Sequence, residues 1–140
     1  MDLATATSTT RSDVDAAVAA AASASTDAGL APDAFAMEER TDPCFAEMGG
    51  LSGEVQAVVE ASADAGDGSG LAPVVTAVAA AWESLGYTVE QAEPPEGPAP
   101  LLFATAADGR KASLRYAVPR ADRPWRLRIG ASSPCVEPDA

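Results

Sequence analysis

The stretch from Leu71 to Val89 restricts the fold of this chain more than any other part of the sequence. Its apolar residues recur at intervals of three and four, the spacing of one helix face, and they are Val74, Val78, Trp82 and Leu85. Gly86 suits the position just past a helix end, and Tyr87 opens a segment of β character. The pattern predicts a central helix over residues 71–86 that buries one face and is followed at once by a strand.

Apolar and polar residues alternate after this helix, as they do in strands with one buried face. The expected strands cover residues 87–93, 101–106, 110–118 and 125–131. Asp108 and Gly109 are a strong signal for a tight hairpin between the second and third of them. These elements predict a two-layer α+β fold. In it, an antiparallel sheet of about four to six strands, with its main part over residues 87–131, packs on the central helix.

The first half of the chain is rich in alanine and poor in larger apolar residues. Val, Leu, Ile and Phe make up 24 of the 140 residues, and 14 of these 24 lie within residues 71–136. Residues 1–11 are expected to form a disordered tail. An additional Ala-rich helix is expected over residues 12–28, with Ser12 as its N-cap and Asp13 in its first turn.

Residues 30–62 are harder to assign from the sequence. An extended strand leading into Cys44 is favoured, because large and small residues alternate ahead of it, although a short helix also fits. Residues 54–61 alternate in a similar way and predict an edge-like strand, although a short helix is possible there too. We expect a single domain over residues 12–136, followed by a tail over residues 137–140.

The two cysteines, Cys44 and Cys135, provide the strongest indication of the compartment. Each follows a proline in an extended segment, which favours a disulfide between them, and the alternative is two unrelated buried thiols. A disulfide would place the protein outside the cytosol. Residues 1–10 lack the apolar run of a signal peptide, and no stretch approaches the roughly 18 apolar residues of a membrane span. We therefore expect a secreted or cell-envelope protein whose export signal is absent from this sequence.

Charge is distributed unevenly in this acidic chain, whose net charge is -12. Residues 1–109 carry -16, whereas residues 110–128 carry +6. Within the basic segment, the period of the predicted strands places four cations on the sheet face opposite the helix: Lys111, Arg115, Arg126 and Arg128. We interpret them as a candidate binding surface, and the alternative is that they pair with acidic groups of the same chain.

Catalytic or cofactor chemistry has little support in the sequence. The chain has no histidine, so it has no imidazole to act as a general base. Its two cysteines lie 91 positions apart and have no histidine to complete a metal site with them. The acidic pairs Glu38–Glu39 and Asp64–Asp67 fit solvated surface charges better than an acid–base pair. The glycine-rich loop of residues 63–70 lacks the spacing and the lysine of a phosphate-binding loop. Both tryptophans and both tyrosines fit core positions better than a carbohydrate platform.

Four short motifs resemble those of small secreted proteins and lipoproteins of actinobacteria. They are Cys44, the run from Trp82 to Val89, the Asp108–Gly109 turn and the closing run from Ser133 to Val136. The likeness covers roughly residues 40–136. It implies export, an antiparallel sheet after a helix that ends in Gly-Tyr, and a disulfide closed by the late Pro-Cys. The chain lacks the lipidated N-terminal cysteine of many such proteins, and no site residue is carried over from them.

Two functions remain open from the sequence. The first is a non-catalytic exported or cell-envelope module whose basic sheet face binds a protein or an anionic polymer, with nucleic acid disfavoured by the overall negative charge. The second is a structural subunit or inhibitor in a larger envelope or secretion assembly, which docks through the Ala-rich helix of residues 12–28. The protein is expected to be a monomer or a subunit of a larger assembly, and no cofactor is expected.

Overall fold

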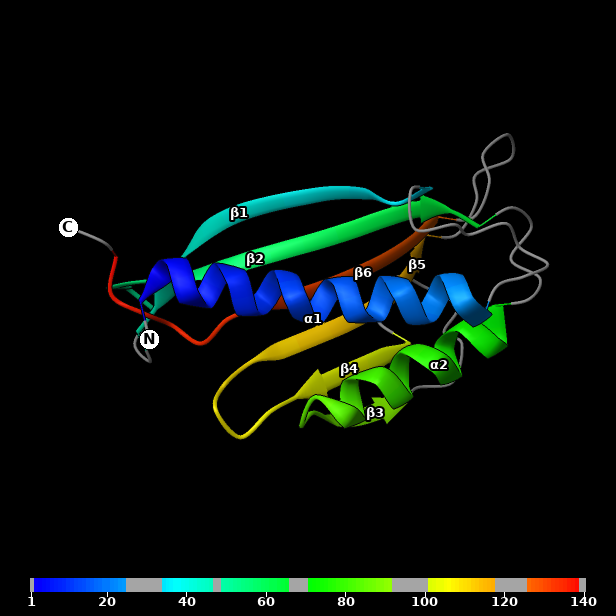
Figure 1. Ribbon diagram of the computed structural model, residues 1–140. Helices are drawn as coiled ribbons and strands as arrows, with labels where there is room; N and C mark the ends of the chain where they lie inside the picture. The colour runs from blue at the N-terminus through cyan, green and yellow to red at the C-terminus, as the bar shows by residue number, and fades with distance from the viewer. Residues whose placement is uncertain are drawn as a thin grey trace.

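The computed structural model describes residues 2–24, 34–46, 49–65, 71–91, 101–117 and 126–138. Two helices pack on one face of a six-stranded antiparallel sheet (Figure 1). The elements are α1 (Leu3–Ala24), β1 (Ala36–Phe45), β2 (Leu51–Asp64), α2 (Leu71–Ser84), β3 (Thr88–Gln91), β4 (Leu102–Thr105), β5 (Lys111–Ala117) and β6 (Arg126–Ser132). The strand order is β1-β2-β6-β5-β4-β3. The predicted α+β fold of two layers is therefore confirmed.

The central helix of the prediction is α2. Val74, Val78 and Trp82 are fully buried on its inner face, as the apolar spacing predicted. After the last turn, the Gly86 N–H donates to the carbonyl of Glu83 and the Tyr87 N–H donates to that of Trp82. This pair of bonds, with Gly86 at a φ of 93°, satisfies carbonyls that a helix end leaves free. The chain then turns directly into β3.

The strands β3 to β6 follow one another in a meander, and the predicted segments agree with them within a few residues. The tight turn lies where expected, because Ala106 and Gly109 close the loop between β4 and β5 through backbone hydrogen bonds. The apolar residues of these strands, Leu102, Leu114, Leu127 and Ile129, are fully buried beneath the helices. On the opposite face, Phe103, Arg115 and Arg128 are exposed, and Ser113 and Gly130 are half-buried.

The ambiguous region of residues 30–62 contains two long strands in its described part. β1 runs into Cys44 as favoured, and β2 pairs with it along most of its length. β2 was expected at the edge, which is wrong: it also pairs with β6 from Val58 to Asp64, so β1 is the edge strand. The difference arises because a run of alternating residues does not show how many neighbours a strand has.

The largest correction concerns α1, which begins at Leu3 rather than at Ser12. Residues 3–11, expected to belong to a disordered tail, form its first half. Asp2 is the N-cap, since the Thr5 N–H donates to its carboxylate at 2.7 Å, and this hydrogen bond lowers the pKa of Asp2. Ser12 is exposed in the middle of the helix, and residues 25–28 lie outside the described residues.

Two threonines explain why the start of α1 was hard to predict. The hydroxyls of Thr7 and Thr10 donate to the carbonyls of Leu3 and Ala6, four residues earlier, so the helix itself satisfies these polar groups. Ala6 is fully buried in a small cluster with Ala57 and Val136. The polar composition of this segment therefore hides a narrow face that packs on the domain.

The predicted disulfide is present and joins Cys44 at the end of β1 to Cys135 after β6. The segment around Cys135 is also held by backbone bonds, because Val55 and Val136 pair in both directions and the Ser133 N–H donates to the Ala57 carbonyl. The C-terminal segment is thus fixed beside β2. Within the described residues, no helix combines the length and apolar character needed to cross a membrane.

Candidate functional site

Both helices cover the same face of the sheet, and the other face is open to solvent (Figure 1). All four predicted basic residues are exposed on this open face, Lys111 and Arg115 from β5 and Arg126 and Arg128 from β6. The alternation of the strands places them there, because their neighbours Ala112, Leu114, Leu127 and Ile129 are buried under the helices. The four cations nevertheless have different surroundings.

Arg126 is neutralised within the chain. Its guanidinium lies 3.2 Å from the carboxylate of Asp64 on the neighbouring strand, and it also donates to the hydroxyl of Ser62 at 2.9 Å. Asp64 and Arg126 are Cα partners in the β2–β6 pairing, so the contact is a direct cross-strand ion pair. For this residue the alternative interpretation, a pair with the chain's own acids, is what the structure shows.

Arg115 and Arg128 present the opposite case. They are Cα partners across β5 and β6, so two like charges stand side by side on one face, an arrangement that destabilises a sheet. No described carboxylate pairs with either of them, or with Lys111. The other four arginines in the described part of the chain all contact a carboxylate, and they are Arg11, Arg40, Arg110 and Arg126. The unpaired cations are thus gathered on β5 and β6.

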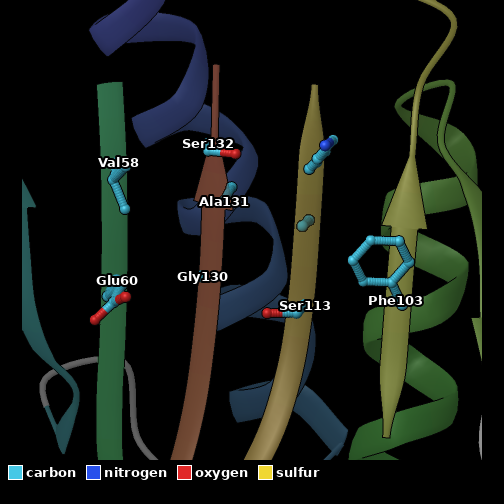
Figure 2. A pocket seen from close by; sticks show the side chains of 9 residues that line it. Val58, Glu60, Phe103, Ser113, Gly130, Ala131 and Ser132 are labelled. Atoms are coloured by element: carbon cyan, nitrogen blue, oxygen red, sulfur yellow. The ribbon is translucent and has the colours of Figure 1, made fainter. Parts of the chain in front are cut away.

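A shallow trough connects these unpaired cations. One row of paired residues crosses four strands in the order Glu60, Gly130, Ser113 and Phe103, with small residues in the centre and large ones at the sides. Figure 2 shows Glu60 and Phe103 on either side of Gly130 and Ser113. Two adjoining hollows of about 220 and 190 Å³ share Glu60, Ser113 and Gly130. We call this depression the β5–β6 trough.

The two ends of the trough are basic. Arg115 and Arg128 line one hollow, and Lys111 lines the other. Between them, the side of Phe103 is apolar and its side chain is 41 % exposed. The opposite side carries the Glu60 carboxylate, which lies 3.3 Å from Arg40, an arginine that also pairs with Asp42. An anionic group entering at Arg115 and Arg128 would meet two guanidinium groups that form no ion pair with a described acid, with Glu60 on the far side of the same hollow.

The carboxylate pairs considered from the sequence do not form acid–base sites. Glu38 and Glu39 point to opposite faces of β1, and Glu39 lies 2.6 Å from Arg11 on α1. Asp64 pairs with Arg126, and Asp67 lies outside the described residues. Across the ranges that the structure describes, no group of three acidic or cysteine side chains is placed to hold a metal ion.

The aromatic residues follow the core interpretation where they can be followed. Trp82 is fully buried and Tyr87 is 4 % exposed, with their ring centroids 6.2 Å apart. The side chains of Tyr116 and Trp125 lie outside what the structure describes. Neither Trp82 nor Tyr87 is available as a carbohydrate platform.

A buried polar cluster was missed from the sequence. The Tyr87 hydroxyl donates to Asp13 at 2.7 Å, and the Arg110 guanidinium lies 3.2 Å from the same carboxylate and 4.8 Å from the centre of the Tyr87 ring. Arg110 also donates to the carbonyl of Leu85 and contacts Asp108. Burial raises the pKa of the Tyr87 phenol far above its ordinary value, and the bond to Asp13 adds to the shift. The cluster joins α1, the end of α2 and the β4–β5 hairpin, which indicates a structural role.

The trough itself also contains two residues that sequence reasoning passed over. Phe103 follows two leucines, so the run gave no alternation to show that it faces solvent. Gly130 was visible as a glycine inside a predicted strand, a signal that commonly marks close approach of a ligand or another backbone. Comparison of the chain with family models, with curated proteins and with solved structures finds no match, so the assignment rests on this geometry.

Proposed function

We propose that the protein is a non-catalytic exported or cell-envelope binding module whose open sheet face holds an anionic partner between Arg115 and Arg128. The observation that carries this proposal is the direct pairing of two arginines, neither of which forms an ion pair with a described acid, in a chain of net charge -12. A protein with 21 acidic residues has many ways to compensate two arginines. Leaving them opposed favours a charge supplied from outside.

The chemistry of arginine supports a carboxylate or phosphate as the bound group. Each guanidinium is planar, remains charged at all physiological pH values, and donates two parallel hydrogen bonds to such an oxyanion. Binding would also remove the repulsion between Arg115 and Arg128, which the free protein has to tolerate. The surrounding acidic surface would limit non-specific attraction of anions, so recognition depends on the local geometry.

The disulfide supports the exported location. Bridges such as Cys44–Cys135 form and persist in oxidising compartments and are rare in the cytosol. With both cysteines bonded and no histidine in the sequence, the chain also offers neither a free thiol nor an imidazole as nucleophile or general base. Both observations favour binding over catalysis.

The second function considered from the sequence, docking through the Ala-rich helix, has less support than the first. Ala6, Ala17 and Ala21 are fully buried against the protein's own sheet and α2. These small residues of α1 serve close packing inside the domain, whereas others, such as Ala4 and Ala19, are exposed. No other observation favours this function over the first.

The test is a titration of the ¹⁵N-labelled protein with inorganic phosphate at pH 6.5, followed through the arginine side-chain N–H resonances. We expect saturable shifts at Arg115 and Arg128. The double variant R115Q/R128Q should lose them, and R126Q, which removes an arginine already paired with Asp64, should keep them. Shifts of equal size at all exposed arginines, or no saturation, would contradict a specific anion site.

A further inference from the structure

We infer that the partner contributes an extended acidic peptide segment, with one carboxylate held by Arg115 and Arg128, a second held by Lys111, and the chain between them crossing Gly130. This inference rests on the proposed function and names the class of ligand for the same site. It is carried by three features of the β5–β6 trough. They are the spacing of its cations, its glycine floor and its two unlike sides, and Figure 2 shows the floor at Gly130 between Glu60 and Phe103.

The spacing of the cations matches the repeat of an extended peptide. Lys111 and Arg115 lie four residues apart on β5, about 13 Å at about 3.3 Å per residue. In an extended peptide, residues four apart point to the same side and are separated by the same distance. A peptide that runs along β5 and β6 can therefore place carboxylates at both basic ends of the trough.

The residue at the floor of the trough is a glycine, although the fold does not require a glycine at this position. Gly130 lies within β6, which is paired on both sides, and its φ is not in the left-handed region that favours glycine. A Cβ added there would meet only the Glu60 Cγ at 3.4 Å and the Val59 carbonyl oxygen at 3.7 Å, ordinary contacts. Glycine weakens a strand interior, so its presence without a structural need favours close approach of a ligand.

The sides of the trough disfavour a continuous polyanion. Glu60 stands beside the centre and would repel a charge placed there, although its carboxylate can accept hydrogen bonds from peptide N–H groups. Phe103 on the other side offers an apolar surface to an uncharged side chain. The Cα atoms of Glu60 and Phe103 are three strand spacings apart, about 14 Å, which is wide enough for one extended chain. Anionic ends and a neutral centre are thus the favoured pattern.

Two labelled peptides of identical composition test the inference, with affinities measured by fluorescence anisotropy on the full disulfide-bonded chain. In the first, acetyl-Glu-Thr-Val-Thr-Glu-amide, the glutamates are four residues apart. In the second, acetyl-Glu-Glu-Thr-Val-Thr-amide, they are adjacent and point to opposite sides of an extended chain. We expect the first to bind about fivefold more tightly, the effect of one additional exposed charge pair.

Variants locate the effect within the trough. K111Q should weaken binding of the first peptide about three- to fivefold and leave the second unchanged, because only the first reaches Lys111. G130V places a side chain on the floor of the trough and should weaken binding of the first peptide. The thermal stability of the protein should stay equal or rise, since valine suits a strand. R126Q is the matched control on the same strand and face, and it should change neither affinity.

The outcomes separate this inference from the proposed function. Equal affinity of the two peptides, with phosphate shifts still present at Arg115 and Arg128, would overturn the peptide assignment and leave the anion site standing. Tighter binding of a galacturonic acid trimer than of either peptide would also overturn it, in favour of an acidic sugar chain. Absence of the phosphate shifts would overturn the proposed function and this inference together.

Discussion

Tyr87 follows the Gly86 turn that ends α2, and its hydroxyl contacts the one α1 carboxylate that is buried. Asp13 is 4 % exposed, and it accepts hydrogen bonds from both Tyr87 and Arg110. A buried carboxylate is costly unless such donors surround it. The cluster therefore ties α1 to the end of α2 and to the β4–β5 hairpin through hydrogen bonds.

Replacing Tyr87 by Phe removes the hydrogen bond to Asp13. The free energy of unfolding should fall by about 1.5 to 3 kcal/mol at pH 8, the usual contribution of a hydrogen bond to a charged group. The raised pKa of Tyr87 in the folded protein gives this contribution a pH dependence. It is fully present below the ordinary tyrosine pKa of about 10 and is lost as pH rises further, because only the unfolded chain then ionises.

The measurement is urea unfolding of the wild type and Y87F at pH 8 and pH 11, followed by tryptophan fluorescence. The difference between the two proteins should shrink by about 1.4 kcal/mol at pH 11, since pH 11 lies about one unit above the unfolded pKa and each such unit costs the wild type about 1.4 kcal/mol. Other titrating groups cancel in this comparison. A difference that stays constant between the two pH values would show that Tyr87 is not protected from ionisation.

At the scale of elements, α1 is the part of the fold that the sequence concealed. Its second half carries Val14, Ala17, Val18 and Ala21 into the main core, and its first half carries Ala6 into the cluster with Ala57 and Val136. The exposed ion pair between Arg11 and Glu39 adds a contact to the edge strand β1. The helix thus spans the sheet from β6 to β1.

Deleting residues 2–11 should lower the free energy of unfolding by at least about 2 kcal/mol, because a helix shortened to its second half loses buried surface and approaches the length at which helices are marginal. Thermal unfolding followed by circular dichroism measures the loss. If these residues formed a tail, as their composition suggested, the melting temperature would not move.

Ser12 to Ala is the matched point variant for the same question. In the middle of a helix and exposed, as observed, alanine should leave the stability unchanged or raise it by up to about 0.5 kcal/mol. At an N-cap the same change would lower it by about 1 kcal/mol. The sign of the change therefore reports whether the helix begins before or at Ser12.

The sequence was most informative where burial imposes a period. The stripe of α2 and the alternation of β5 and β6 predicted both the elements and the exposed face of Arg115 and Arg128, because side chains on one face must meet the same environment. Strand neighbours were less predictable: β2 was placed at an edge, since nothing in its pattern specifies that β6 returns to pair with it. Periodicity describes a single element, whereas pairing is a property of the assembled sheet.

The site was predictable in part for the same reason. Four basic residues were expected on one face, but only the register shows that Arg126 meets Asp64 while Arg115 meets Arg128. Phe103 and Gly130 acquire meaning only as members of one row across four strands. Residue types indicated the surface, and the order of the strands determined which charges on it remain unpaired.

At the scale of the whole molecule, the two edge strands have features that discourage pairing with another sheet, whereas the sheet face opposite the helices is open to solvent. β1 carries Pro43 and four charged residues, and β3 at the other edge has only four residues, features that discourage pairing with another sheet. The face has no such protection, because β5 and β6 present arginines and a glycine floor to solvent. This contrast favours recognition through side chains over addition of a further strand.

The disulfide should contribute to the stability of the whole fold without taking part in binding. Cys44 and Cys135 close a loop of 91 positions that contains all of the sheet after β1, so the bridge restricts the unfolded chain strongly. The variant C44A/C135A should unfold at lower urea concentration, with a loss of about 2 to 5 kcal/mol. Adding a thiol reductant should lower the free energy of unfolding of the wild type to a similar extent. The same treatment should leave the stability of the variant unchanged. The phosphate-induced shifts of the Arg115 and Arg128 resonances should survive in the variant, because β5 and β6 pair with each other away from the bridge.

Equal stability of the oxidised and reduced wild type would contradict this prediction. It would show that the β1 and C-terminal segments are held by backbone pairing alone.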